Sequence, residues 1–368
     1  MSNTNKKKII FLITGSGIGG AEIVVKNLIF NIDHKKFLPV FVSIRPLGTI
    51  GEEIGKKYKA ISLNASEKFN PLFLWKLFVV IRNEKPEILH CHLFHANLIG
   101  RIIGRISKVP FIVSTIHSDN FGGKFRYFLL KITDFLTDIT VVVSEKIKED
   151  LVKRKIITIN KIKVIYNGVP ENKDIINKED IEKIKNNLKI TNNYPILLSV
   201  GRLTQVKGQI YLIQALSILK DKYPDIKLLL IGDGPEKLSL VGEVNKLRLT
   251  NNVLFLGELR DISLFYKLAD IFILPSLNEG FGLAVVEAMS NKLLVVASRV
   301  GGVSEIINNR VTGFMVNTAD YTALYNVINK AALITETEKN LIISNAYIEF
   351  QTKFSLKKMI ANYDELYK

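Results

Sequence analysis

The stretch from Glu279 to Glu287 combines residue types that suit a ligand rich in oxygen atoms, because two carboxylates flank a glycine-containing turn. The turn follows an apolar strand pattern and leads into a helical pattern, so its backbone N–H groups are expected at a helix N-terminus, which favours anionic groups. The residues that would supply these groups are Gly280, Phe281, Gly282 and Leu283. A carboxylate also accepts hydrogen bonds from neighbouring hydroxyls of a ribose or a hexose. The pattern predicts a sugar or nucleotide site.

Glu287 has apolar neighbours on both sides, Ala284–Val286 and Ala288–Met289. A charge in apolar surroundings needs a partner. These neighbours favour a ligand-binding role for Glu287 over that of an exposed helical glutamate.

Two cations follow an earlier strand pattern, Ile196–Val200. Arg202 can donate to two phosphate oxygens at once, and Lys207 adds a compact positive charge about one turn later. Cations at the carboxyl end of a parallel strand suit a diphosphate leaving group. A pair of solvated surface cations is the plainer alternative. A further turn, Gly232–Pro235, ends the next strand and is interpreted as structural.

The first glycine cluster, Gly15–Gly20, lies between a strand pattern and a helical pattern. It matches the G-x-G-x-x-G spacing of dinucleotide-binding loops, which raises the alternative of a nicotinamide-dependent oxidoreductase. That alternative expects an acidic residue at the end of the second strand, where the chain has Arg45 instead. An arginine there would accept the 2′-phosphate of NADP.

The cluster His90-Cys91-His92 resembles a metal site at first sight. On a strand the two histidines share one face and the cysteine points to the other, so the three side chains cannot converge on one ion. We therefore predict no metal here. His92, at the end of its strand, is instead a candidate for the acceptor side of the active site.

Short apolar runs alternate with helical patterns along the whole chain, which indicates parallel sheets covered by helices. We predict ten strands, five in each half of the chain: Ile9–Thr14, Val40–Ile44, Ile88–His92, Phe111–Thr115, Ile139–Ser144, Ile196–Val200, Lys227–Ile231, Val253–Leu256, Ile271–Leu274 and Leu294–Ala297. The predicted fold is α/β, with two Rossmann-like doubly wound domains and a cleft between them.

A polar stretch, Glu171–Asn193, separates the two series of strands. We place the N-terminal, acceptor-side domain at residues 1–168 and the C-terminal, nucleotide-sugar-binding domain at residues 169–354. Residues 355–368 have apolar side chains at helical spacing and form a last helix.

The chain has 368 residues and a net charge of +16, and the charge is unevenly distributed. Residues 1–168 contain 27 Lys and Arg against 13 Asp and Glu, a net charge of +14, whereas residues 169–368 carry only +2. A single cysteine points to a reducing compartment. No apolar run reaches the about 18–20 residues of a membrane-spanning helix, and no secretory signal is evident. These observations predict a cytoplasmic protein.

Two segments of the basic half combine aromatic residues with Lys or Arg, namely Pro71–Arg82 and Lys124–Lys131. Each alone is better explained as a helix that faces the core. Together with the charge of +14 they suggest contact with anionic lipid on the cytoplasmic face of the inner membrane, and a lipid-linked acceptor. No zinc spacing or aromatic RNA-binding signature points to nucleic acid.

The ordered set of motifs resembles glycosyltransferase family 4, whose members have the GT-B fold. The residues that carry the resemblance are Gly19-Gly20-Ala21-Glu22, His117, Asn167-Gly168-Val169, Gly201-Arg202-Leu203, Lys207-Gly208, Gly232-Asp233-Gly234-Pro235 and the pair Glu279/Glu287. The resemblance covers nearly the whole chain. It implies a retaining transfer without a metal ion or other cofactor, and a C-terminal helix that crosses back to the first domain.

The resemblance also implies roles for particular residues. Arg202 and Lys207 would hold the donor pyrophosphate, and Glu287 the ribose hydroxyls. Glu279 and the backbone amides of residues 280–283 would contact the donor sugar. His117 would lie near the donor sugar and the acceptor, and the loop of Gly19 and Gly20 would line the catalytic cleft.

The sequence therefore predicts a glycosyltransferase that moves a sugar from a nucleotide-sugar donor, with UDP favoured, to a glycan or polyprenyl-linked acceptor in polysaccharide, lipopolysaccharide or capsule synthesis. His117, Glu279, Arg202 and Lys207 are the predicted catalytic residues. An NADP-dependent oxidoreductase and a non-enzymatic protein that binds polyanions or membranes are the alternatives.

Overall fold

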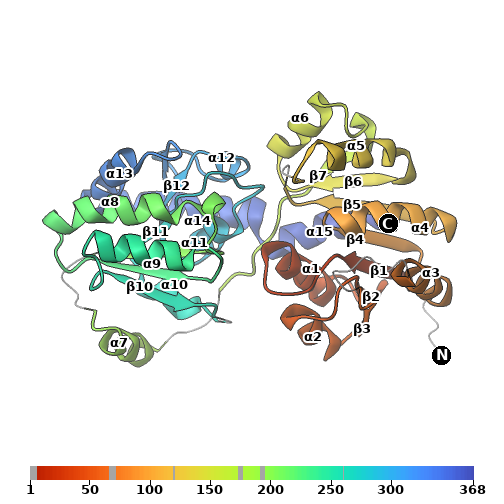
Figure 1. Cartoon of the computed structure of the whole chain (residues 1–368), viewed down its shortest axis with the longest axis horizontal. Helices are drawn as coiled ribbons and strands as arrows, with labels where there is room; N and C mark the ends of the chain where they lie inside the picture. The colour runs from red at the N-terminus through yellow and green to blue at the C-terminus, as the bar shows by residue number, and fades with distance from the viewer. Residues whose placement is uncertain (1–5, 66–71, 119–120, 173–176, 191–194, 260) are drawn as a thin grey trace. The chain divides into compact units, whose positions relative to one another are not determined.

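The computed structural model describes residues 6–65, 72–118, 121–172, 177–190, 195–259 and 261–368, and the first residue of the segment Pro71–Arg82 lies outside them. The chain forms two compact units (Figure 1). The first comprises residues 1–168 and 356–368, and the second comprises residues 169–355. Each unit is an α/β domain built on a parallel sheet.

The first unit has a seven-stranded sheet in the order β3-β2-β1-β4-β5-β6-β7. All of its neighbouring strands pair in parallel. The strands are β1 (Lys7–Ile13), β2 (Phe37–Ser43), β3 (Lys59–Ser62), β4 (Ile88–His92), β5 (Phe111–Ile116), β6 (Ile139–Val142) and β7 (Ile162–Val164). The order reverses between β1 and β4, and ligands of doubly wound sheets bind at the carboxyl ends of strands at such a point.

Helices cover both faces of this sheet because alternate residues of the central strands point to opposite sides. Ile9 and Phe11 of β1 pack with α1, α2 and α15, whereas Ile10 and Leu12 pack with α3 and α4. The helices of the unit are α1 (Gly20–Asn31), α2 (Thr49–Gly55), α3 (Leu72–Glu84), α4 (Phe94–Ile106), α5 (Lys124–Ile132), α6 (Glu145–Lys153) and α15 (Leu356–Leu366).

The last helix, α15, belongs to the first unit although the whole second unit precedes it in the sequence. Tyr363 and Tyr367 are each 1% exposed in the core that β1 and α1 share. The Tyr367 hydroxyl makes a 2.6 Å hydrogen bond with Nδ1 of His90, in β4. Nζ of Lys7 donates to the carbonyl of Tyr367 at 3.2 Å. The end of the chain is thus part of the first unit's core.

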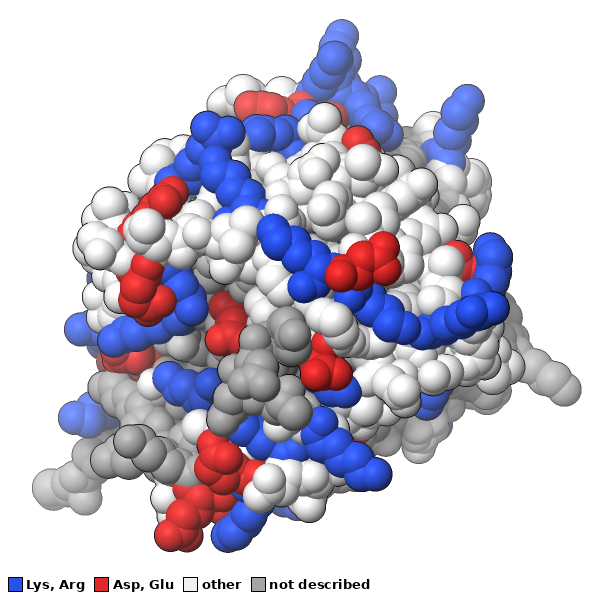
Figure 2. Space-filling view, turned by 90° about the vertical axis from the view of Figure 1, so that its left-hand side faces the viewer, with Lys and Arg blue, Asp and Glu red and all other residues white. Residues whose placement is uncertain are grey.

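The second unit has a six-stranded parallel sheet in the order β10-β9-β8-β11-β12-β13, which reverses between β8 and β11. Its strands are β8 (Ile196–Val200), β9 (Lys227–Ile231), β10 (Val253–Gly257), β11 (Ile271–Leu274), β12 (Leu294–Ser298) and β13 (Phe314–Val316). Figure 2 shows one face of this unit, on which basic and acidic side chains are interspersed. This mixture agrees with the composition of residues 169–355, where 21 Lys and Arg stand against 20 Asp and Glu, a net charge of +1.

A large core in the second unit joins Leu212 of α8, Leu240 of α9 and Ile328 of α13 to the sheet. The helices of the unit are α7 (Lys178–Asn187), α8 (Gln209–Lys222), α9 (Lys237–Lys246), α10 (Ser263–Leu268), α11 (Leu283–Ser290), α12 (Val303–Ile306), α13 (Tyr321–Leu333) and α14 (Glu336–Glu349). Among the residues that the structure describes, no helix combines the length and apolar character that crossing a membrane requires.

The predicted α/β fold with two Rossmann-like domains is confirmed, and so are the ten predicted strands to within a few residues at their ends. Three further strands, β3, β7 and β13, were not predicted. Each is an edge strand of three or four residues, too short for a recognisable apolar run. The strand before His117, Phe111–Thr115, is the fourth of the predicted strands, but the unpredicted β3 precedes it and makes it the fifth strand of the chain.

Candidate functional site

The predicted donor-site residues of the second unit lie in the segments that follow β8 and β11 and in the helix α11. These two strands are hydrogen-bonded neighbours at the point where the strand order reverses. Arg202 and Lys207 follow β8, whereas Glu279 and the turn to Gly282 follow β11. Residues about 75 positions apart are therefore brought to one edge of the sheet.

Glycines allow the loops at this edge to pack backbone against backbone. Gly208 has φ +65°, and a Cβ built on it would lie 2.2 Å from the carbonyl oxygen of Pro275, at the end of β11. Gly301 has φ +42°, and its Cβ would lie 1.8 Å from the carbonyl oxygen of Glu279. The backbone N–H of Leu277 donates to the carbonyl of Val206 at 2.7 Å. The loops after β8, β11 and β12 therefore support one another.

Lys207 and Glu279 form an ion pair at this edge, with 2.5 Å between Nζ and Oε1. The same carboxylate oxygen accepts a 2.8 Å hydrogen bond from Oγ of Ser276, which is fully buried. The side chains of Lys207 and Glu279 are 28% and 11% exposed. Glu279 thus holds the Lys207 ammonium at the end of β11 while the ammonium keeps access to solvent.

The helix α11 begins at Leu283 beside this ion pair, and Gly282 precedes it with φ +102°, a conformation that favours glycine. Phe281 is 3% exposed, and its ring packs edge-on against Phe354 at 5.8 Å. The start of an α-helix leaves backbone N–H groups without partners inside the helix. The structure therefore contains the predicted helix N-terminus, held in place by a buried aromatic ring.

Glu287 lies in α11 with its carboxylate in largely apolar surroundings, as its sequence neighbours predicted. Its partner is Tyr266 of α10, whose hydroxyl donates a 2.9 Å hydrogen bond to Oε2. Burial raises the pKa of Glu287 to about 7, and the hydrogen bond from Tyr266 partly opposes that rise. The carboxylate therefore changes its protonation state near neutral pH.

Arg202 is exposed just beyond β8, and its loop packs on the loop that follows β9. The backbone N–H of Leu203 donates to the carbonyl of Asp233, and a Cβ on Gly234 would lie 2.3 Å from the carbonyl oxygen of Leu203. The glycine turn after β9 thus supports the arginine loop, which agrees with its interpretation as structural.

In the first unit, Gly19 and Gly20 stand at the start of α1, directly after β1. Glu22 folds back over this turn, so that a Cβ on Gly19 would lie 2.4 Å from a Glu22 carboxylate oxygen. Burial raises the pKa of Glu22. The preceding part of the loop is braced by α2, because the N–H of Gly48 donates to Oγ of Ser16 at 2.9 Å.

His92 and His117 lie at the carboxyl ends of the neighbouring strands β4 and β5, and Nδ1 of His92 shares a 3.1 Å hydrogen bond with Nε2 of His117. Burial lowers the pKa of His117 to about 4, so its imidazole is neutral at pH 7. His90 lies on the same face, and its Nε2 bonds Oγ1 of Thr115 at 2.6 Å. Cys91 points into the core of the opposite face.

The predicted site residues therefore form two groups, one in each unit. The first contains Gly19, Gly20, His92 and His117, and the second contains Arg202, Lys207, Glu279, Gly280, Phe281, Gly282, Leu283 and Glu287. No group of three His, Cys, Asp or Glu side chains among the described residues has a geometry that could hold a metal ion.

Two family models match the chain. "Glycosyltransferase Family 4" matches residues 18–173, and "Glycosyl transferases group 1" matches residues 180–347. An uncharacterized glycosyltransferase of Methanocaldococcus jannaschii, MJ1607, is 30% identical over 270 residues, which are 67% of this chain and 69% of that protein. The chain belongs to glycosyltransferase family 4.

Another relative within this range of similarity is the UDP-Gal:alpha-D-GlcNAc-diphosphoundecaprenol alpha-1,3-galactosyltransferase of Escherichia coli. It is 29% identical over 310 residues, 80% of this chain and 78% of that protein. The crystal structure of Anabaena Alr3699/HepE in complex with UDP and glucose matches with a TM-score of 0.87 and 23% identity, covering 98% of this chain and 99% of that chain. This structural similarity shows that the chain has the GT-B fold.

The sequence did not indicate three contacts that the predicted site residues make. Tyr266 partners Glu287, Ser276 partners Glu279, and Glu22 covers Gly19. Glu22 stands within a quoted motif and Ser276 lies three positions before Glu279, so a polar residue within three positions of each predicted site residue was the available signal. Tyr266 is 21 residues from Glu287 on another helix, and the sequence contains no comparable signal for it.

Proposed function

We propose that this family 4 glycosyltransferase transfers a sugar from a UDP-sugar to a lipid-linked or glycan acceptor, with retention of the anomeric configuration and without a metal ion. The observation that carries the proposal is the Lys207–Glu279 pair beside the start of α11, at the reversal point of the second sheet. The site combines a cation, a helix N-terminus and a carboxylate, the groups expected for a phosphate and a sugar. The similar proteins support UDP, since one is named for its donor UDP-Gal and another was crystallised with UDP.

In this proposal Arg202 and Lys207 stabilise the diphosphate that leaves the sugar, a function that a divalent metal ion would otherwise supply. Glu287 accepts hydrogen bonds from the ribose hydroxyls. Glu279 both positions Lys207 and, with the amides of residues 280–283, contacts the donor sugar. No cofactor takes part.

For the chemical step we propose attack on the same face of the sugar from which the diphosphate leaves. The bond between the anomeric carbon and the phosphate oxygen breaks, the acceptor oxygen bonds to that carbon, and the leaving phosphate takes the acceptor proton. His117 would be a neutral hydrogen-bonding group near the donor sugar, because its pKa of about 4 keeps the imidazole uncharged at pH 7. His92 would orient His117 through their shared hydrogen bond.

The test of this function begins with a thermal-shift screen of the full chain with UDP, GDP, ADP, their sugars and NADPH. We expect a saturable stabilisation by UDP and a UDP-sugar that 5 mM EDTA leaves unchanged; the stabilisation follows from binding to the folded state alone. NMR of the product formed from that donor then reports the anomeric configuration. Stabilisation by NADPH alone, loss of activity with EDTA, or an inverted product would each contradict the corresponding part of the proposal.

The pKa of Glu287 leads to a pH-dependent prediction. Folding raises this pKa from 4.5 to about 7, so the folded state holds more protons and the free energy of unfolding decreases as pH rises across that interval. Ribose hydroxyls instead favour the ionised carboxylate. We therefore expect UDP affinity to increase as pH rises through about 7, measured by calorimetry from pH 5.5 to 8.5.

The matched control for this titration is Glu287→Gln, which keeps a hydrogen-bond acceptor for Tyr266 but cannot ionise. The terminal phosphate of UDP itself titrates near pH ~6, and that contribution is common to both proteins. The difference between the two curves therefore reports on Glu287. Parallel curves would show that the carboxylate does not bind the ribose in its ionised form.

A lipid-linked acceptor would be reached at a membrane surface, and we propose that the first unit binds there peripherally. The net charge of +14 over residues 1–168 supports an anionic surface as the partner. The named substrate of the Escherichia coli relative, a diphosphoundecaprenol, supports a lipid-linked acceptor.

A further inference from the structure

The helix α5 exposes a stripe of large apolar side chains that the proposed reaction does not use. Phe125, Phe128 and Ile132 are 70%, 54% and 46% exposed, and Phe135 just beyond the helix is 73% exposed. Their spacing of three or four residues places them along one side of the helix. In α5 only Leu130 is fully buried. The expectation that Lys124–Lys131 is a core-facing helix is therefore wrong, because its aromatic side chains largely point to solvent.

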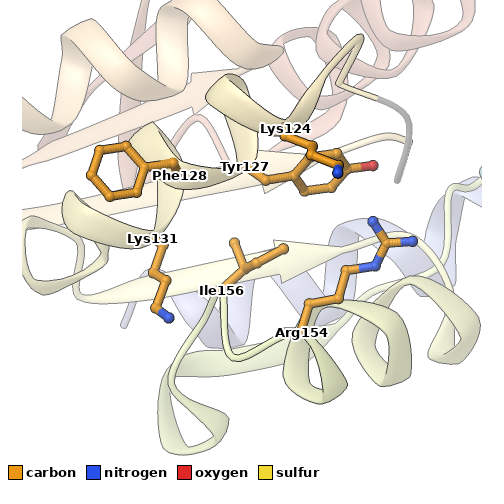
Figure 3. A pocket seen from close by; sticks show the side chains of 6 residues that line it. All are labelled: Lys124, Tyr127, Phe128, Lys131, Arg154 and Ile156. Atoms are coloured by element: carbon orange, nitrogen blue, oxygen red, sulfur yellow. The ribbon is translucent and has the colours of Figure 1, made fainter.

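A pocket of about 260 Å³ lies beside this stripe, between α5 and the segment that follows α6 (Figure 3). Three of the six described residues that line it are cationic, and none is acidic. The lining comprises Lys124, Tyr127, Phe128, Lys131, Arg154 and Ile156. Figure 3 shows Ile156 between Lys131 on one side and Arg154 on the other. The pocket thus presents positive charge around an apolar floor.

Packing restrains the Arg154 side chain, since its guanidinium carbon lies 5.0 Å from the ring centroid of Tyr127. A guanidinium held against an aromatic ring keeps its N–H groups free to donate in a fixed plane, which suits phosphate oxygens. Lys124 and Lys131 are exposed, so their ammonium groups reach the mouth of the pocket at little cost. The pocket lining therefore offers two exposed ammonium groups and one restrained guanidinium to a phosphate.

We propose that this pocket binds the phosphate of an anionic phospholipid headgroup while Phe125, Phe128, Ile132 and Phe135 insert between the acyl chains. This inference rests on the proposed function, in which the enzyme encounters its acceptor at a membrane. It adds the place where the first unit contacts that membrane. A soluble phosphate would use the three cations but leave the apolar stripe in water. A bilayer surface uses both, as interfacial helices with basic and aromatic faces do.

The experiment is co-sedimentation of the full chain with vesicles of phosphatidylcholine alone or with 30% phosphatidylglycerol. We compare the wild type with the double variant Lys124→Gln/Lys131→Gln. The matched control is Lys246→Gln/Lys330→Gln, which removes the same charge from exposed positions of the second unit. With about 1 kcal/mol per basic residue near an anionic surface, the pocket variant should bind about thirtyfold more weakly, and the control should bind like the wild type. Phe128→Ser should also weaken binding.

Three results would overturn the assignment: equal binding to both kinds of vesicle, equal loss in the two double variants, or displacement of the wild type from vesicles by millimolar glycerol phosphate. The first excludes an anionic lipid, the second excludes this pocket, and the third indicates a site for soluble phosphate. Stabilisation by UDP is measured on the same samples. UDP binding that persists without vesicle binding would contradict the lipid site alone, whereas vesicle binding without any UDP binding would contradict only the proposed function.

Discussion

Alanine at position 202 or 207 is expected to lower kcat/KM about a hundredfold, because each substitution removes a charge that stabilises the leaving diphosphate. Lys207→Ala has a second effect, since it leaves the partly buried Glu279 carboxylate without its ammonium partner. That carboxylate would then repel the diphosphate. We therefore expect the loss to be at least as large for Lys207→Ala as for Arg202→Ala, and initial rates with the identified UDP-sugar measure both.

Two further variants make this prediction specific to charge at the site. Lys246→Ala removes an exposed lysine of α9 that pairs with Glu243, and it should leave kcat/KM unchanged. Lys207→Arg keeps the charge but not its compact shape, and it should recover part of the lost activity. If Arg202→Ala and Lys207→Ala both retained full activity, the diphosphate would not bind at the end of β8.

Tyr363→Ala is expected to destabilise the first unit by about 3–5 kcal/mol, the usual cost of removing a large buried ring. The side chain is 1% exposed in a core built on β1, and burial raises its pKa because the ring has almost no access to water. Thermal unfolding with a probe in the first unit should show a lower midpoint. Stabilisation by UDP should persist in the second unit if the two units unfold separately.

Conservative variants distinguish the stability lost with buried side-chain volume from the stability lost with a hydrogen bond. Tyr367→Phe keeps the ring but leaves Nδ1 of His90 without its 2.6 Å partner, so we expect a smaller loss of about 1–3 kcal/mol. Lys357→Ala changes an exposed residue of α15 and should shift stability by no more than about 0.5 kcal/mol. A Tyr363→Ala protein as stable as this control would show that α15 contributes little to the first unit.

The sheet edge that carries the predicted donor site could be located from sequence because β8 and β11 are largely apolar runs, each followed by glycine and charged residues. Their predicted bounds match the observed strands. The Lys207–Glu279 contact could not be predicted, since it depends on how the loops after β8, β11 and β12 pack together at Gly208 and Gly301. Helical periodicity likewise placed α5 correctly but did not indicate that its aromatic residues face solvent. Periodicity identifies a common face and leaves open what covers it.

The protonation state of Glu287 depended on the fold even more than these contacts did. Burial raises the pKa of Glu287 to about 7, and the hydrogen bond that Tyr266 donates from another helix partly opposes that rise. Glu279 has an ammonium within 2.5 Å. Tertiary packing supplies both the Tyr266 hydroxyl beside Glu287 and the Lys207 ammonium beside Glu279.

The position of α15 has a consequence for how the protein is made. On the ribosome, residues 1–168 emerge first, but the helix that completes their core is encoded after the entire second unit. At about 5–20 residues per second, synthesis of residues 169–355 takes roughly 10–40 s. During that time β1, α1 and the polar atoms of His90 lack Tyr363 and Tyr367. The nascent first unit therefore exposes apolar surface that chaperones could recognise, and its core is complete only after residues 356–368 have been synthesised.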